Sequence, residues 1–147
     1  MTGAVADPLR EFGPELLPHS GTARLLTEIV RSGRDFVEAI CQVPAAHPLA
    51  SGGRAPCFLG LELGAQAAAA LEALERGTAT GDSAPRIGYL VRVREATFLM
   101  PDLPIETPLF VVAHLEGAAP PLAIYRISIG VDGIEFLQAT LSTYSAT

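Results

Sequence analysis

Residues 59–76, which read LGLELGAQAAAALEALER, constrain the fold more than any other segment. Alanine and leucine are strong helix formers, and Gly77 follows as a natural C-terminal stop. At about 1.5 Å per residue, this helix would be roughly 25 Å long. Its first three turns are apolar around almost the whole circumference, and only the last turn, with Glu72, Glu75 and Arg76, is expected to be solvated. The pattern predicts a long helix that the rest of the chain surrounds.

Strand-like segments lie on both sides of this helix. Two precede it, and four follow it without another helical pattern between them: 23–31, 35–43, 86–99, 108–116, 122–130 and 133–145. Asp132-Gly133, between the last two, indicates a two-residue hairpin, because Asp-Gly accepts the positive φ of a type I′ turn. Residues 44–56 and 77–85 are expected to be loops. The order predicts an α+β fold in which an antiparallel sheet of five to six strands wraps around one central helix.

The length of 147 residues fits one domain, which we expect to span residues 1–147. The first residues have no basic start followed by an apolar stretch, and no apolar run reaches the roughly 20 residues of a membrane helix. We therefore expect a cytoplasmic protein with no membrane span. Cys41 and Cys57 lack zinc-site spacing, so we expect no metal; one disulfide between them remains open, although free thiols in a reducing cytosol fit better.

Charge excludes several classes of function. The formal net charge is −6, and all ten basic residues are arginine, because the chain has no lysine. Chemistry that needs a lysine, such as a Schiff base, is therefore excluded. An acidic chain with scattered arginines is also a poor candidate for binding nucleic acid, since phosphate neutralisation dominates that affinity.

The candidate site lies around the start of the central helix. Glu62 is in the first turn and Gln66 is four residues later, so both side chains share one face. Glu62 could serve a reaction, or it could simply complement the helix dipole from a solvated position. His47 lies fifteen residues upstream; histidine is a residue type suited to acid–base work near neutral pH, but a loop histidine is more often only solvated. Backbone amides near Cys57 and Phe58 would point from the helix N-terminus toward a negatively charged oxygen.

Together these residues resemble the hot-dog 3-hydroxyacyl-acyl carrier protein dehydratases. That family has a histidine in a His-Phe-Pro-type loop, a Pro-Gly pair, and a helix that opens with Glu or Asp and has Gln four residues later. His47, Pro56, Glu62 and Gln66 stand at those places, although the loop reads His-Pro-Leu and the pair is Pro56-Cys57. The segments ELLPHSGTARLLTEIV and IGYLVRVREATFLMPDLP are also similar to the family. GGRAP before a Leu-Glu helix resembles the accessory dehydratases of aryl polyene-type pathways.

The resemblance implies dehydration of a (3R)-3-hydroxyacyl thioester to the trans-2-enoyl thioester, in fatty acid or polyene-type biosynthesis. His47 of one protomer would take the C2 proton, and Glu62 of the other, partly protonated in apolar surroundings, would protonate the leaving hydroxyl. His19, in the other matched segment, is the competing histidine. Gln66 would orient the acid, and the backbone at Cys57, Phe58 and Gly60 would bind the thioester oxygen. The family needs no cofactor, and it implies a homodimer or a higher homo-oligomer.

The substrate carrier would be acyl carrier protein or coenzyme A. Carrier proteins are acidic, as this chain is, so docking needs a local basic patch. Arg92 and Arg94 project from one strand face and Arg54 lies in the loop before the helix, which makes them candidates for docking the carrier or its phosphopantetheine phosphate. They could equally be ordinary solvated charges.

Two other functions remain open from the sequence. A hot-dog acyl thioesterase would use Glu62 to activate water, on the same fold. A non-catalytic subunit would bind acyl chains or complete a heterodimer with an active homologue. The altered His-Pro-Leu loop favours the second of these alternatives.

Overall fold

The computed structural model describes residues 24–81 and 88–145. Its elements, in chain order, are β1 (Leu26–Ser32), β2 (Phe36–Cys41), β3 (Arg54–Pro56), the 3-10 helix η3 (Cys57–Leu59), α2 (Gly60–Thr80), β4 (Gly88–Phe98), β5 (Asp102–Pro104), β6 (Leu109–Ala119), β7 (Leu122–Val131) and β8 (Ile134–Ser145). In the described part of the chain, six strands form one antiparallel sheet in the order β1-β2-β6-β7-β8-β4, and β3 pairs separately with β5.

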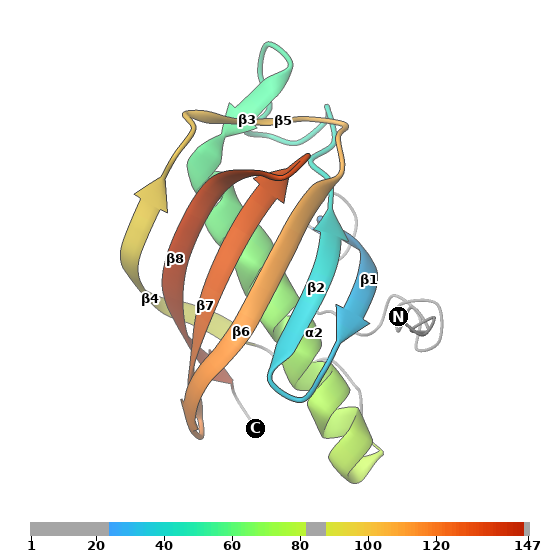
Figure 1. Ribbon diagram of the computed structural model, residues 1–147, viewed down its shortest axis with the longest axis vertical. Helices are drawn as coiled ribbons and strands as arrows, with labels where there is room; N and C mark the ends of the chain where they lie inside the picture. The colour runs from blue at the N-terminus through green and yellow to red at the C-terminus, as the bar shows by residue number, and fades with distance from the viewer. Residues whose placement is uncertain (1–23, 82–87, 146–147) are drawn as a thin grey trace.

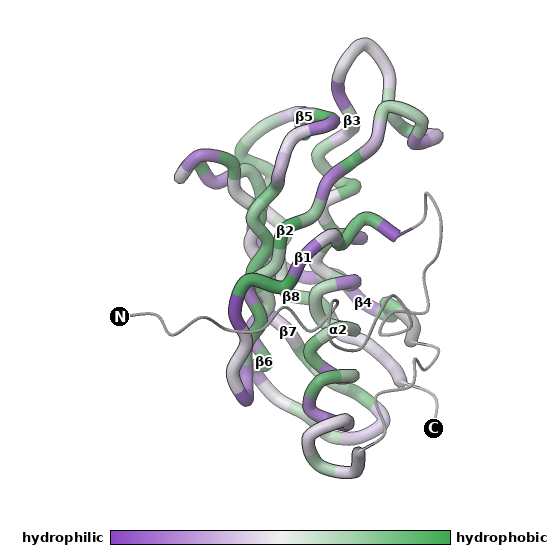
Figure 2. Tube along the Cα trace, turned by 90° about the vertical axis from the view of Figure 1, so that its right-hand side faces the viewer, coloured by the Kyte–Doolittle hydropathy of each residue, from purple (hydrophilic) through white to green (hydrophobic). Residues whose placement is uncertain are grey.

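The sheet curves around α2, which crosses its concave face obliquely (Figure 1). Seen from the side, the helix lies against this face, and the β3–β5 pair lies at one end of the molecule (Figure 2). Side chains alternate between the two faces of the central strands, so Leu109, Val111 and Ala113 are buried against the helix while Phe110 and His114 are exposed. The predicted architecture of a sheet around one helix is confirmed.

Two glycines allow the helix to lie close to the sheet. A Cβ atom at Gly60 would lie 2.5 Å from Leu137 Cδ2, and one at Gly64 would overlap Ile127 Cδ1. Because real atoms do not approach so closely, a side chain at either position would force the helix or the side chains of Leu137 and Ile127 to shift. The pair stands at helical i, i+4 spacing, which places both residues on the face that meets the sheet.

The end of α2 differs from the prediction. Gly77 does not stop the helix, which continues to Thr80 and ends at Gly81 in the left-handed conformation, with φ of 77°. Hydroxyls of Thr78 and Thr80 donate to the carbonyls of Leu74 and Arg76 at 3.0 and 2.7 Å, which satisfies acceptors of the last turns. The extra turn became helical because a glycine inside a helix only weakens it, whereas Gly81 supplies the positive φ of a C-terminal cap.

The hairpin between β7 and β8 is confirmed. Asp132 and Gly133 have φ of 50° and 78°, the two positive values that the Asp-Gly pair was expected to adopt. Cys41 and Cys57 are both buried and free, so the disulfide left open by the sequence does not form.

By length and hydropathy alone, Cys57–Thr80 could cross a membrane, but 61% of its most apolar window is buried inside the protein. In this fold the segment is the core helix.

Strand β4 differs from the other long strands. It lies at the edge of the sheet, and every side chain described between Leu90 and Leu99 is exposed. The exposed set includes five large hydrophobic residues: Leu90, Val91, Val93, Phe98 and Leu99. A strand that is open along one edge and apolar on its surface is a site for pairing with another chain.

Candidate functional site

Glu62 and Gln66 form the centre of the candidate site. Glu62 lies in the first turn of α2 and is partly buried, whereas Gln66 is completely buried. Gln66 Nε2 donates to Glu62 Oε1 at 3.1 Å, as the i, i+4 spacing predicted. This hydrogen bond fixes the Glu62 carboxyl group at the edge of the core.

Gln66 is itself held by the first strand. Its Oε1 atom accepts the backbone amides of Leu25 at 2.8 Å and Leu26 at 3.1 Å. A neutral amide suits this position, because its oxygen accepts from the strand while its nitrogen donates to the acid. The orientation of Glu62 therefore depends on how β1 begins, a contact that spans about forty residues and has no local sequence signal.

His47 lies in the loop between β2 and β3, and its hydrogen bonds indicate which tautomer a neutral ring adopts. The Leu49 amide donates to His47 Nδ1 at 3.0 Å, while the His47 backbone bonds Pro44 and Ala50. The Glu106 carboxylate, just after β5, accepts the Ala45 amide at 2.5 Å, which holds the start of this loop in place. Because Nδ1 accepts a hydrogen bond, a neutral His47 ring carries its proton on Nε2. In this conformation, Nε2 is a donor.

The backbone at the start of the helix is partly engaged within the chain. The Cys57 amide donates to the Pro101 carbonyl at 3.1 Å, and the Gly60 amide bonds the carbonyls of Cys57 and Phe58. Burial raises the pKa of the Cys57 thiol, so this group is not an activated nucleophile. The Phe58 side chain is exposed, with 54% of its surface accessible. Of the residues expected to bind an oxygen, Phe58 is the one that faces outward.

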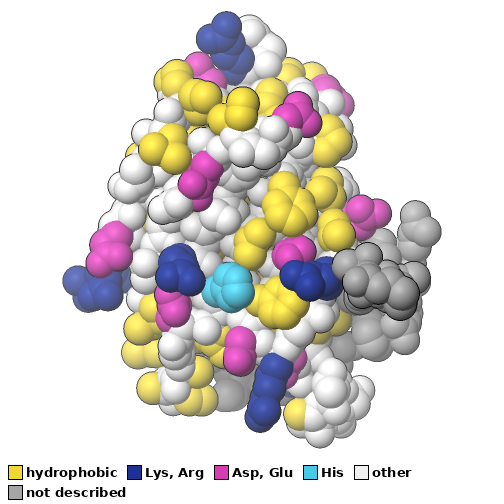
Figure 3. All heavy atoms as spheres, viewed as in Figure 1, with side chains coloured by type: hydrophobic (Ala, Val, Ile, Leu, Met, Phe, Trp, Pro, Cys, Tyr) yellow, Lys and Arg dark blue, Asp and Glu magenta, His cyan; other side chains and the backbone are white. Residues whose placement is uncertain are grey.

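The three arginines do not form one patch. Arg54 is on β3, at the end of the molecule, where its guanidinium lies 3.6 Å from the Asp102 carboxylate. Arg92 and Arg94 are two residues apart on β4, so they share one face of the strand, and both are exposed. They pair with Ser142 and Thr140 of β8, on the outer face of the sheet. Figure 3 shows that this face carries basic, acidic and hydrophobic side chains together. His19 lies outside the described residues.

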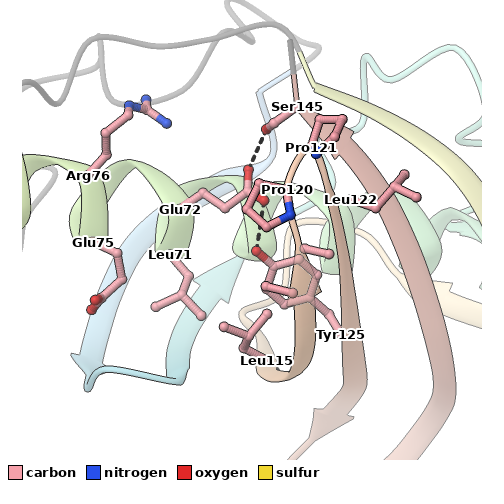
Figure 4. A pocket seen from close by; sticks show the side chains of 12 residues that line it. Leu71, Glu72, Glu75, Arg76, Leu115, Pro120, Pro121, Leu122, Tyr125 and Ser145 are labelled. Atoms are coloured by element: carbon pink, nitrogen blue, oxygen red, sulfur yellow. Dashed lines mark hydrogen bonds between the residues drawn. The ribbon is translucent and has the colours of Figure 1, made fainter. Parts of the chain in front are cut away.

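The sequence missed a second carboxyl site, in the C-terminal half of α2. Glu72, expected in a solvated turn, accepts the Tyr125 hydroxyl at 2.9 Å and the Ser145 hydroxyl at 2.8 Å. Figure 4 shows its side chain directed toward these two residues, at the edge of a pocket. Burial, and then the Glu72 charge, raises the pKa of Tyr125, so the phenol keeps its proton and remains a donor. No pattern of spacing could have found contacts that span 53 and 73 residues.

No group of three or more His, Cys, Asp or Glu side chains in residues 24–81 and 88–145 is arranged to hold a metal ion. The positioned Glu62 carboxyl group can take part in proton transfer and hydrogen bonding.

Comparison of the chain with known families gives one match. The ApeP-like family, described as ApeP dehydratase, matches residues 14–147. No curated protein matches the sequence.

Several solved structures share the fold. A chain of the dehydratase heterocomplex ApeI:P from Xenorhabdus doucetiae is 20% identical, with a TM-score of 0.81 and 90% of each chain covered. A hypothetical thioesterase with coenzyme A from Streptococcus pneumoniae has a TM-score of 0.58 and 15% identity, covering 81% of this chain and 84% of its own. The PaaI protein of Escherichia coli has a TM-score of 0.58 and 13% identity, covering 81% and 78%. These likenesses confirm the hot-dog fold.

Proposed function

The chain belongs to the ApeP-like dehydratase family, and we propose that its substrate is a (3R)-3-hydroxyacyl thioester carried on acyl carrier protein. Membership makes it a hydro-lyase with a hot-dog fold. In the proposed reaction a proton leaves C2, the C3–O bond breaks, and the hydroxyl leaves as water after taking up a proton. A C2=C3 double bond forms, and no electrons are gained or lost, so the reaction as proposed uses no cofactor. We also infer a single domain over residues 1–147, which the family match over most of this length supports.

Glu62 is the proposed acid. The observation that carries this role is the hydrogen bond from the buried Gln66 amide, which holds the carboxyl group in one orientation at the start of the core helix. A positioned carboxyl group at the edge of an apolar core can donate a proton to a departing hydroxyl. Gln66 acts through Glu62, so it is a positioning residue.

His47 of a second protomer is the proposed base. To accept the C2 proton at Nε2, the ring must carry its other proton on Nδ1, the atom that now accepts the Leu49 amide. The hydrogen bond from Leu49 therefore has to open when the active site assembles. His19 is the competing base, and it requires no such change of this loop. The Phe58 backbone amide is proposed to bind the thioester oxygen as negative charge develops.

A second protomer is proposed to pair along β4 and to cover the partly buried face of α2. The exposed hydrophobic residues of β4 support this assembly, because they would be buried by it. We propose a cytoplasmic homodimer. The heterocomplex formed by the similar structure from Xenorhabdus doucetiae favours one alternative, in which the second protomer is a related chain that supplies the histidine.

Carrier docking is proposed for Arg92 and Arg94. Both are exposed on the outer face of β4, and neither forms an ion pair within the described residues. Arg54 is a weaker candidate, since Asp102 already lies beside it.

Mass spectrometry of 3-hydroxyacyl carrier protein incubated with the purified chain tests the proposal. Loss of 18 mass units, roughly one water, from the acyl group is the expected result. Glu62→Gln should abolish it, whereas Glu28→Gln, an exposed carboxylate on β1, should leave it intact. His47→Ala and His19→Ala identify the base. Loss of the entire acyl group would instead indicate a thioesterase. No reaction until a related hot-dog chain is added would indicate the heterodimer.

A further inference from the structure

A cavity of about 280 Å³ lies between the C-terminal half of α2 and the turn of the β6–β7 hairpin. Most of its wall is apolar, formed by Leu71, Leu115, Pro120, Pro121 and Leu122 (Figure 4). Cavities near this size that are apolar apart from a few directed polar groups are typical of sites for small molecules or parts of them.

Glu72, Glu75 and Arg76 line the polar side of the cavity, together with two hydroxyl groups. Glu72 is held by hydroxyls of Tyr125 on β7 and Ser145 on β8, one at each oxygen. A carboxylate oxygen has two lone pairs, so each oxygen can accept a second hydrogen bond. In a cavity whose wall is mostly apolar, a carboxylate favours a ligand whose apolar body ends in a hydrogen-bond donor such as a hydroxyl group.

The cavity lies further along α2 than the proposed acid, on the C-terminal half of the helix. Glu62 and Glu72 are ten residues apart, which is roughly 15 Å along the helix and about 2.8 turns. Between them, Ala65 and Ala69 are only partly buried. Their side chains are short, so neither would block an acyl chain that lies along the helix from one carboxyl group to the other. With carbon–carbon bonds of about 1.5 Å, an extended acyl chain needs on the order of a dozen carbons to cover that distance.

We propose that this cavity binds the distal end of the substrate's acyl chain and that Glu72 recognises a hydroxyl group there. The inference rests on the proposed function, and it adds a substrate class: long-chain 3-hydroxyacyl thioesters with a donor at the far end. Tyr125 and Ser145 are positioning residues, because they hold Glu72 in place.

Binding of a matched pair of compounds tests this inference without requiring turnover. Tetradecanoyl-pantetheine and 14-hydroxytetradecanoyl-pantetheine cannot be dehydrated, since neither carries a 3-hydroxyl group. Calorimetry with the full-length protein should show that the terminal hydroxyl improves affinity about tenfold, the effect of one hydrogen bond to a charged group. Equal affinities for the two compounds would overturn the proposal.

Two pairs of variants locate the effect. Glu72→Gln should reduce the preference for the hydroxyl to about twofold, while Glu116→Gln, an exposed carboxylate on the outer face, should retain it. Ala118→Trp places a large ring in the wall of the cavity and should weaken the binding of both compounds at least tenfold. Ala119→Trp, at the next, exposed position of β6, should not. If Glu72→Gln keeps the full preference, Glu72 is not the recognising group.

A free small molecule is the other source of the same chemistry. If 1-octanol binds and Ala118→Trp prevents this, while the two acyl-pantetheines bind equally, the cavity is a separate ligand site and the acyl-chain assignment is wrong. Failure of the proposed function has a different signature. In that case 3-hydroxyacyl substrates would not lose water, while the calorimetric preference and its dependence on Glu72 would still be measured.

Discussion

Replacement of Gln66 by leucine separates the structural role of this residue from its role in the site. Gln66 is completely buried, and it accepts the Leu25 and Leu26 amides while donating to Glu62. Leucine has a similar volume, so little cavity forms, but the two amides lose their acceptor. Each buried donor without a partner costs about 1–3 kcal/mol, so we expect Gln66→Leu to lower the free energy of unfolding by roughly 2–6 kcal/mol.

Urea unfolding at fixed protein concentration measures this loss of stability. A loss of about 4 kcal/mol, the middle of the expected range, corresponds to a Tm lower by roughly 8–16 °C. Gln66→Glu is the informative companion, because it keeps an oxygen for both amides. Its protonated form should retain most of the stability, whereas ionisation of this completely buried carboxyl group beside Glu62 should destabilise the fold. The substitution replaces the donor to Glu62 with a second carboxyl group, so the dehydration rate and its pH profile should change where the fold persists. Gln138→Leu, at an exposed position on β8, should change stability by less than about 0.5 kcal/mol. A Gln66→Leu protein within about 1 kcal/mol of wild type would refute the reasoning.

Three further predictions concern the packing of the helix, the response to pH and the docking of the carrier. Gly64→Ala should destabilise the protein by about 1–3 kcal/mol in urea unfolding, because its Cβ would meet Ile127, whereas Gly117→Ala, with open space around it, should stay within about 0.5 kcal/mol. Burial raises the pKa of the Cys41 thiol and of the Tyr125 phenol, so the unfolded chain ionises before the folded one. Stability should therefore be intact below about pH 8.5 and fall from there to pH 11, and a flat profile would contradict this. Replacing both Arg92 and Arg94 by alanine should raise KM for carrier-linked substrates but not for pantetheine-linked ones, while Arg34→Ala, in the β1–β2 turn, should affect neither; an equal rise for both substrates would exclude carrier docking.

Local signals account for the parts of the fold that the sequence predicted. The central helix follows from a long run of strong helix formers, and the β7–β8 turn follows from Asp132-Gly133, since two adjacent positive φ values suit few other pairs. The Glu62–Gln66 hydrogen bond was predictable for the same reason, because four residues in a helix make one turn. The β3–β5 pair was missed, since strands of three residues are too short to show alternation.

Long-range contacts account for what the sequence could not predict. The chain itself does not indicate that Gln66 would accept amides from β1, or that Tyr125 and Ser145 would hold Glu72. A glutamate in the last polar turn of an apolar helix has the same local pattern whether water or two hydroxyls surround it. His47 illustrates the limit for loops: its type suggested a base, but the Leu49 amide, two residues away, decides which ring nitrogen holds the proton.

Because the edge of β4 is exposed, the stability of this protein is expected to depend on its concentration. Five large hydrophobic side chains on and just after this strand are in contact with water in the single chain. If assembly covers them, dilution removes part of what stabilises the fold, and heating curves recorded at different concentrations should not superimpose. In a homodimer, a cell that makes little of this chain would hold single protomers with an open strand edge, prone to proteolysis. In the heterodimer alternative, the same exposure would follow whenever the related chain is made in smaller amounts than this one.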